Sequence, residues 1–264
     1  MFRENFKITL LGEKMNIKTD TGKSSNLEIN NRSEFYKLYK ESPVVQDEKL
    51  DNLGLFLSRR HLSRIMFMHE MYQKIINVNG VIMEFGVRWG QNLALFENFR
   101  GMYEPYNHTR KIIGFDTFEG FPSVDKKDGQ SDNASVGSYS VADDYELYLD
   151  QVLAYHESES PISHLKKYEL VKGDASKTLE KYLQQHPETI VALAYFDFDI
   201  YEPTKKCLEL IKGRLSKGSI IGFDELNFSE FPGETIAFDE VLGIQNYRIV
   251  RSPITPLPSY IIVE

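Results

Sequence analysis

Short apolar segments, each followed by a glycine or an acidic residue, constrain the fold of this chain more than any other feature. They span residues 81–85, 111–115, 168–172, 190–198 and 219–223. Helical patterns separate most of them, and strands that alternate with helices form a parallel sheet with helices on both faces. Two further segments, 247–250 and 260–263, predict an antiparallel hairpin at the C-terminal end. We therefore expect an α/β fold with a doubly wound, mostly parallel, seven-stranded Rossmann-like sheet.

The helices expected from apolar spacing complete this plan. They span residues 33–39, 60–78, 91–100, 143–155, 176–185, 203–215 and 236–242. Residues 1–78, with a possible short strand at 6–11, are expected to form an N-terminal helical cap and a lead-in helix. Residues 79–264 then form the core domain. An insertion at 117–167 separates the second and third strands, and its recurring aromatic residues favour a lid over a disordered surface loop.

Composition and charge limit the classes of partner. The chain has 264 residues, 41% of them hydrophobic, and a formal net charge of -8, which argues against a nucleic-acid partner. No apolar stretch approaches the ~20 residues of a membrane helix, and the N-terminus does not resemble a signal peptide, so a cytoplasmic location is expected. The single cysteine, Cys207, permits no intrachain disulfide and is expected in the core.

Acidic residues end two of the apolar segments. Asp197 and Asp199 close the segment at 190–198, and Asp224 and Glu225 follow the one at 219–223. Carboxylates in apolar surroundings need a partner, and ligands bind at the carboxyl ends of parallel strands. The pattern predicts a metal or acid–base site. Positions i and i+2 of a strand share a face, so both aspartates are expected to point into one cleft, with Phe196 and Phe198 packing away from it.

The turn at residues 84–92, EFGVRWGQN, follows the first strand and opens a helix. Gly86 and Gly90 permit a tight turn, and the helix N-terminus suits an anionic group. Arg88 stands where a dinucleotide fingerprint requires glycine, which disfavours NAD and is compatible with S-adenosylmethionine. Glu84 is positioned to attract the ammonium of that cofactor. Trp89 is expected either near the cofactor or in the core.

Acids after the second and third strands extend the expected cofactor site. Asp116 ends the second strand, where an acid accepts hydrogen bonds from ribose hydroxyls. Asp174 either reads the adenine amine or caps the helix that begins at Ser176. The expected cofactor-binding residues are Glu84, Gly86, Val87, Arg88, Gly90, Asn92, Asp116, Thr117, Phe118, Asp174 and Asp197.

A family resemblance joins these motifs. EFGVRWGQN, GFDTFEGFP, YFDFDIYEPT and IIGFDELNFSEFPGETIAFDEVLG occur in this order over about residues 80–245. Together they resemble the macrocin O-methyltransferase family, class I S-adenosylmethionine-dependent enzymes that methylate sugar hydroxyls, mostly in natural-product glycosides. The DELN and FPGET sequences are most similar to members that act on deoxysugars of enediyne-type compounds.

The resemblance also implies roles for the acids. A Mg²⁺ ion would be held by Asp197, Asp224 and Glu225, and Asp199 would be the general base, with Asp197 as a further catalytic residue. The family's adjacent pair is usually Asp-Asp, so Glu225 either ligates the metal or orients a catalytic group. Members often form oligomers, and a homo-oligomer is expected here, with residues 6–39 as a candidate interface.

The sequence therefore predicts an O-methyltransferase that acts on a hydroxyl group of a sugar. The expected acceptor is a deoxysugar of a natural-product glycoside or a surface glycan, presented as a glycoside or a nucleotide sugar. One alternative is a methyltransferase with a phenolic or other small-molecule acceptor, and another is a nucleotide-binding α/β protein. Asp199 has a structural alternative as a helix cap or a partner of Lys205. His108 or His156 is an alternative base if the insertion closes over the site.

Overall fold

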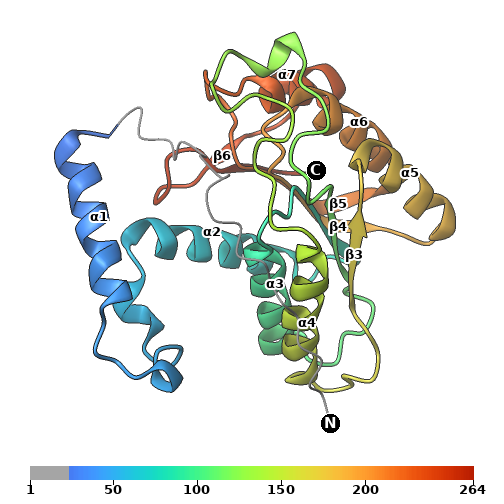
Figure 1. Ribbon diagram of the computed structural model, residues 1–264. Coiled ribbons are helices and arrows are strands. Elements are labelled where there is room, and N and C mark those ends of the chain that lie inside the picture. Colours follow the sequence, from blue (N-terminus) through green and yellow to red (C-terminus); the bar gives the residue numbers. More distant parts are fainter. Residues whose placement is uncertain (1–23) are drawn as a thin grey trace.

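The computed structural model of the chain describes residues 24–264. Its centre is a seven-stranded sheet with the strand order β3-β2-β1-β4-β5-β7-β6 (Figure 1). The strands are β1 (Val81–Phe85), β2 (Ile112–Asp116), β3 (Tyr168–Lys172), β4 (Val191–Phe196), β5 (Leu215–Phe223), β6 (Val250–Arg251) and β7 (Ser259–Ile262). Strands β1 to β5 pair in parallel, and β7 pairs antiparallel with both β5 and β6. The expected fold class is confirmed.

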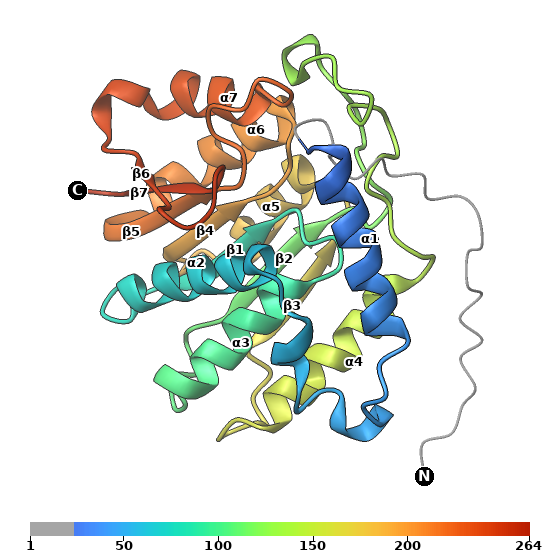
Figure 2. The ribbon, with the colours of Figure 1, turned by 90° about the vertical axis from the view of Figure 1, so that its left-hand side faces the viewer.

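Helices cover both faces of the sheet. The α-helices of residues 24–264 are α1 (Asn26–Lys40), α2 (Arg59–Ile75), α3 (Gln91–Tyr103), α4 (Tyr145–Ser158), α5 (Ala175–Gln185), α6 (Tyr201–Ile211) and α7 (Gly233–Leu242). Helices α2, α3 and α4 pack side by side on one face, and α5, α6 and α7 cover the other (Figure 1, Figure 2). No helix in residues 24–264 is long and apolar enough to cross a membrane.

The strand sequences explain why both faces are covered. Alternate residues of β1 enter different cores: Met83 and Phe85 pack towards α5 to α7, whereas Ile82 packs towards α2 to α4. Every residue of the central strand β4 is buried, as expected for a parallel strand with helices on both sides. Each large apolar side chain buried in this way contributes about 1.5–3 kcal/mol to folding.

The N-terminal arm, which we define as residues 24–58, stands away from the sheet (Figure 1). Its helix α1 starts with a capping box between Ser25 and Glu28 and buries none of its residues. The expected helix at 33–39 is therefore part of a longer one. The possible strand at 6–11 lies outside the described residues.

Several element boundaries differ from expectation for physical reasons. Helix α6 begins at Tyr201 because a proline is tolerated in the first turn, so Pro203 lies inside the helix rather than at its start. Strand β5 begins at Leu215 through a register irregularity against β4. Strand β6 is shorter than the expected segment, because Tyr247 packs against Phe238 of α7 instead of joining the sheet.

The insertion at 117–167 divides into two parts. Its helix α4 packs against α3 and belongs to the helical layer. The preceding loop, which we call the 117–144 loop, runs over the carboxyl ends of the strands, in green at the top of Figure 1. Of these two parts of the insertion, the loop is the one that lies where it would cover a ligand.

Candidate active site

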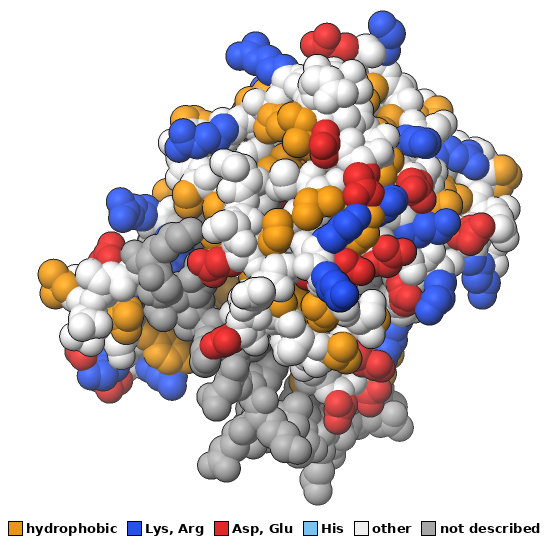
Figure 3. All heavy atoms as spheres, turned by 90° about the horizontal axis from the view of Figure 1, so that it is seen from above, with side chains coloured by type: hydrophobic (Ala, Val, Ile, Leu, Met, Phe, Trp, Pro, Cys, Tyr) orange, Lys and Arg blue, Asp and Glu red, His pale blue; other side chains and the backbone are white. Residues whose placement is uncertain are grey.

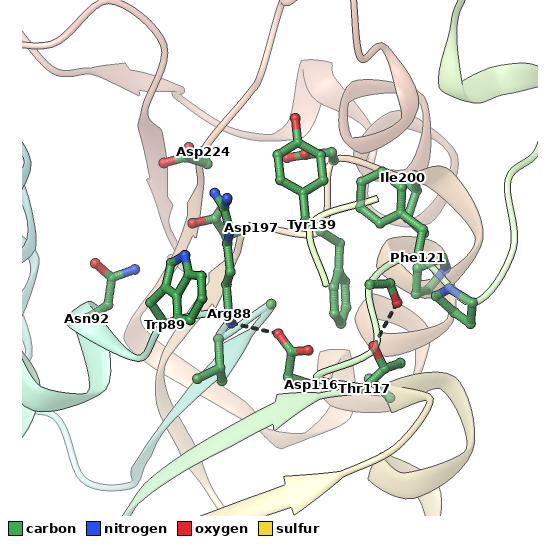
Figure 4. A pocket seen from close by; sticks show the side chains of 18 of the residues that line it. Arg88, Trp89, Asn92, Asp116, Thr117, Phe121, Tyr139, Asp197, Ile200 and Asp224 are labelled. Atoms are coloured by element: carbon green, nitrogen blue, oxygen red, sulfur yellow. Dashed lines mark hydrogen bonds between the residues drawn. The ribbon is translucent and has the colours of Figure 1, made fainter. Parts of the chain in front are cut away.

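A cleft of about 460 Å³ lies at the carboxyl ends of the central strands (Figure 4). This volume is within the range of small-molecule sites. Segments far apart in the sequence form its wall: Arg64, residues 86–92, 116–117, 120–122, Tyr139, residues 173–175, 197–200, Pro203 and residues 224–225. Figure 4 shows Asp197 and Asp224 on one side of the cleft and Phe121 and Ile200 on the other.

The turn after β1 forms one end of the cleft. Gly86 has a φ of +94°, and a Cβ atom there would lie 2.1 Å from the backbone oxygen of Asp197. Only glycine fits so close an approach. Gly90, with a φ of +78°, is the N-cap of α3. Because glycine has no side chain, no N-cap side chain accepts hydrogen bonds from the first backbone amides of this helix, which face the cleft. Such amides suit a carboxylate.

Asp116 is held at the edge of the cleft by two backbone amides. Its Oδ2 accepts from the Arg88 amide at 2.7 Å and its Oδ1 from the Phe118 amide at 2.6 Å. Burial raises the pKa of Asp116, and these amides oppose the rise. Each carboxylate oxygen retains a lone pair for a ligand hydroxyl.

Glu84 lies behind the wall of the cleft instead of in it. Its Oε1 accepts from Asn92 Nδ2 at 2.8 Å, and burial raises its pKa well above the usual range. Asn92 does line the cleft. Among the described residues, Asn92 Oδ1 and Glu84 Oε2 are buried without a hydrogen-bond partner. A cofactor ammonium would therefore meet Asn92 before Glu84.

The remaining expected cofactor residues are placed in different ways. Asp174 caps α5, where its Oδ1 accepts from the Ser176 amide at 3.0 Å, and it also lines the cleft. Val87, Trp89 and Thr117 are in the wall. Phe118 is buried in the core beneath α2 to α4 and contributes its amide rather than its ring.

Asp197 and Asp224 converge on one cation, the guanidinium of Arg64. Arg64 Nη2 donates to Asp197 Oδ2 at 2.5 Å, and Nη1 donates to Asp224 Oδ1 at 2.7 Å. The hydroxyl of Tyr195 also donates to Asp224 Oδ1, at 2.5 Å. Burial and the charge of Asp224 raise the pKa of Asp197, and Arg64 opposes this rise.

Asp199 reaches the cleft by a route that the strand pattern did not predict. Strand β4 ends at Phe196, so the expected alternation does not extend to Asp199. Asp199 instead has a φ of +63°, a left-handed conformation that is strained for a residue other than glycine. The structural alternatives for Asp199 are wrong: α6 has no side-chain cap, and Lys205 pairs with Glu240. Phe196 packs in the core as expected, whereas Phe198 also borders the cleft.

Asp199 and Glu225 form a hydrogen-bonded pair of carboxyl groups, which requires one shared proton. Burial raises the pKa of Asp199 to about 6, and the hydrogen bond from Glu225 opposes the rise. Burial and the charge of Asp199 raise the pKa of Glu225 much further. The pair therefore holds one proton and one carboxylate charge between its two carboxyl groups.

Glu234, in the first turn of α7, holds both acid-bearing loops. Its Oε1 accepts from the Phe198 amide at 3.3 Å, and its Oε2 accepts from the Glu225 amide at 3.2 Å. The residue is fully buried, and burial raises its pKa well above the usual range. One side chain thus ties the loop after β4 to the loop after β5.

The acids do not all fit the expected metal set. Asp197 and Asp224 bind a shared cation and so fit a divalent ion, which proteins often hold with one or two carboxylates. Glu225 points to Asp199 instead. Across residues 24–264, no group of three or more His, Cys, Asp or Glu side chains is arranged to hold a metal ion.

Aromatic residues of the 117–144 loop complete the wall. Phe121 and Tyr139 line the cleft, and their rings are 5.2 Å apart. The Arg88 side chain extends from its backbone beside Asp116 towards Tyr139, whose ring centre is 5.0 Å from the guanidinium (Figure 4). His108 and His156, the alternative bases, are not in the wall.

Two residues central to this arrangement were not expected from the sequence. Arg64 belongs to a helix whose apolar spacing indicated only packing. Glu234 lies within a motif used for the resemblance, but its contact with two backbone amides has no sequence signal.

Around the cleft, charges of both signs are mixed. Figure 3 shows the molecule from above, with Lys and Arg side chains interspersed among Asp and Glu over the described part of this face. Such a surface does not form the continuous basic field that binds a phosphate backbone.

Comparison with known proteins shows the family to which this chain belongs. Residues 57–246 match the family model described as macrocin-O-methyltransferase. The crystal structure of the calicheamicin methyltransferase CalS11 is 41% identical and superposes with a TM-score of 0.87, covering 95% of this chain and 98% of that chain. An apo structure of CalS11, described as a TDP-rhamnose 3'-O-methyltransferase in calicheamicin biosynthesis, is 40% identical with a TM-score of 0.79, covering 90% and 95%.

A more distant structure shares the fold. The O-methyltransferase NovP is 19% identical, with a TM-score of 0.56 and coverage of 76% of this chain and 79% of that chain. No curated protein matches the chain.

Proposed function

This chain belongs to the macrocin-O-methyltransferase family and is an S-adenosylmethionine-dependent O-methyltransferase, and we propose that its acceptor is a hydroxyl group of a sugar. The observation that carries the proposal is the 41% identity to CalS11 over 95% of this chain. A related structure of CalS11 is described as acting on TDP-rhamnose. We infer that the sugar is presented here on a nucleotide or as a glycoside.

The cleft supports the cofactor half of this proposal. Gly86 lets the backbone of the turn lie against the backbone of Asp197, because it has no side chain. Asn92 Oδ1, which has no hydrogen-bond partner, can accept a hydrogen bond from the ammonium group of the cofactor. We expect Asp116 to accept hydrogen bonds from ribose hydroxyls through its free lone pairs, and Asp174, which also lines the cleft, to contact the adenine. When bound, S-adenosylmethionine supplies an activated methyl group on a sulfonium.

The chain's own contribution to the reaction is a positioned base. A sugar hydroxyl is a weak acid, so methyl transfer needs a group that takes its proton in the transition state. Asp199 lines the cleft and shares one proton with Glu225, so this pair of carboxyl groups includes one carboxylate that can accept the hydroxyl proton. Glu234 fixes the backbone on both sides of this pair. We therefore assign Asp199 as the general base and Glu225 as the residue that orients it.

We further propose that a divalent cation assists the acceptor. Asp197 and Asp224 would hold it, because both already bind one shared positive charge. The ion would supply Lewis-acid stabilisation of the deprotonating hydroxyl. Glu225 is left out of this set, since its carboxyl group is engaged with Asp199.

We also propose a homo-oligomer assembled through the N-terminal arm. Helix α1 buries none of its residues, and Leu27, Leu38 and Leu50 are 68%, 65% and 79% exposed. Apolar surface of this extent on an arm that stands off the body indicates a protein partner. Light scattering after size-exclusion chromatography should show more than one copy, and Leu38→Asp should reduce the mass. A monomeric wild-type protein would contradict the proposal.

Calorimetric titration with S-adenosylhomocysteine, with and without Mg²⁺, tests the cofactor site. We expect binding in the micromolar range. Asp116→Asn should weaken it, whereas the exposed Asp143→Asn should leave it unchanged. Binding of NADH in place of S-adenosylhomocysteine would favour a nucleotide-binding α/β protein instead.

A further inference from the structure

Arg64 occupies the position at which a cation would bind the acid pair. Its guanidinium spans Asp197 Oδ2 and Asp224 Oδ1, at 2.5 and 2.7 Å, and its carbon lies 6.0 Å from the centre of the Tyr195 ring. A planar guanidinium suits two carboxylates better than an ammonium, because its donors form a fork. The three side chains are only partly exposed, at 30%, 25% and 16%.

The charge around this contact explains why a cation is needed there. Besides Asp197 and Asp224, the loops after β4 and β5 carry Asp199 and Glu225, and these two share one proton and add one further negative charge. Arg88 contributes a second positive charge but stacks on Tyr139. Without Arg64 or another cation, two partly buried carboxylates would face each other, which is costly.

Arg64 is supplied by a part of the chain separate from the acid-bearing loops. It lies near the start of α2, before the buried residues Phe67 and Met68 that anchor this helix to the sheet. Its neighbours Arg60 and His61 are exposed. The guanidinium is therefore at the end of a flexible side chain on a fixed helix, and it can leave the carboxylates without unpacking the core.

We propose that Arg64 and a divalent cation compete for the same oxygens of Asp197 and Asp224. Arg64 holds the two carboxylates together when no ion is present, and an incoming ion must displace the guanidinium. Arg64 is thus a positioning residue that sets the affinity of the site. This inference rests on the cation proposed above for the methyl transfer, but it concerns binding alone.

Titration with Mn²⁺ alone, with free ion followed by electron paramagnetic resonance, tests the competition. Arg64→Gln should bind Mn²⁺ about tenfold more tightly than wild type or better, because no charge-assisted hydrogen bonds need to be broken first. Arg64→Lys keeps the positive charge but loses the forked arrangement of donors, so its Mn²⁺ affinity should lie between those of wild type and Arg64→Gln. Arg60→Gln, the same change on an exposed residue of α2, should match wild type and controls for net charge.

A measurement on the wild-type protein avoids any effect of substitution on folding. Phenylglyoxal modification of Arg64, followed by mass spectrometry, should be slow in a chelator and several-fold faster with saturating Mn²⁺. Modification of Arg60 in the same samples should not respond to the ion.

The outcomes separate this inference from the proposed function. Equal or weaker Mn²⁺ affinity in Arg64→Gln, absence of binding in all the proteins, or Arg64 reactivity that ignores Mn²⁺ would each overturn the competition. None of these readouts involves methyl transfer. Mn²⁺ results that contradict the competition would not contradict the proposal that the protein methylates sugars. Likewise, failure to methylate sugars would not contradict the competition between Arg64 and the ion.

Discussion

Glu234 accepts a hydrogen bond from the backbone amide of Phe198 at 3.3 Å, although the two residues are 36 positions apart in the sequence. The other oxygen of the same carboxyl group accepts the Glu225 amide. Since Phe198 lies between Asp197 and Asp199, this one buried side chain sets the positions of the acids on both loops.

Replacing Glu234 should therefore impair catalysis more than cofactor binding. Glu234→Gln places an amide NH₂ against one of the two backbone donors, so one loop must shift. We expect kcat to fall by about 10²-fold, as for small misplacements of reacting groups, with little change in S-adenosylhomocysteine affinity. Glu240→Gln, the same change on the half-exposed part of α7, should retain wild-type kcat. Equal kcat values for the two variants would remove the positioning role.

Asp199→Asn tests the assigned base. The amide cannot take a proton from the acceptor hydroxyl, and we expect turnover to fall by about 10²–10⁴-fold. The affinity for S-adenosylhomocysteine should be unchanged, since Asp199 is not among the residues proposed to bind the cofactor. Unchanged turnover in a calorimetrically intact variant would show that another group accepts the proton.

The substitution Glu225→Gln, compared with Glu225→Ala, distinguishes two possible roles of Glu225. If it is a neutral donor to Asp199, Glu225→Gln keeps that donation and should retain most of the wild-type kcat, while Glu225→Ala should lose about 10-fold or more. If it is an ionised metal ligand, both variants should lose activity together. Initial rates of the two variants at saturating acceptor decide between these roles.

Part of this architecture was predictable from the sequence. The apolar strands, the Gly86 turn and the acids after β4 and β5 all reflect local chemistry, so their places in the sheet followed from pattern. The cap at Asp174 was one of two expected roles. These predictions needed no knowledge of which distant side chains meet.

The rest depends on tertiary contacts that leave little local trace. Arg64 is separated from Asp197 by 133 positions, and a lone arginine on an amphipathic helix normally faces solvent. The left-handed conformation of Asp199 requires surroundings that over-determine it, so strand alternation was the wrong basis for placing it in the cleft. The pattern also gave no sign that Glu84 accepts a hydrogen bond from Asn92, or that Asn92 rather than Glu84 lines the cleft.

Glu97, away from the cleft, predicts a pH dependence of stability. This buried residue of α3 lies near Arg100, Glu157 and Lys167, and neither of its carboxyl oxygens has a hydrogen-bond partner among the described residues. Burial raises its pKa to about 8. Between the unfolded pKa of ~4.3 and 8, the unfolded chain loses this proton and the folded chain keeps it, so stability falls as pH rises.

Glu97→Gln should remove that loss. The gain in unfolding free energy over wild type should grow from pH 5 to pH 8 by at most about 1.4 kcal/mol per pH unit, as measured by urea denaturation. Glu209→Gln, a change at an exposed residue of α6, should change the unfolding free energy only slightly, and this change should be the same at every pH. A constant difference for Glu97→Gln would show that this carboxyl group ionises normally.

The central claim is that this methyltransferase acts on a sugar hydroxyl. The most direct test incubates the protein with methyl-labelled S-adenosylmethionine and Mg²⁺, and offers a deoxysugar nucleotide, a sugar glycoside and a catechol as separate acceptors. Mass spectrometry with fragmentation should place the label on a sugar oxygen, and Asp199→Asn should abolish it. Label transferred to the catechol alone would contradict the account and favour a phenolic acceptor.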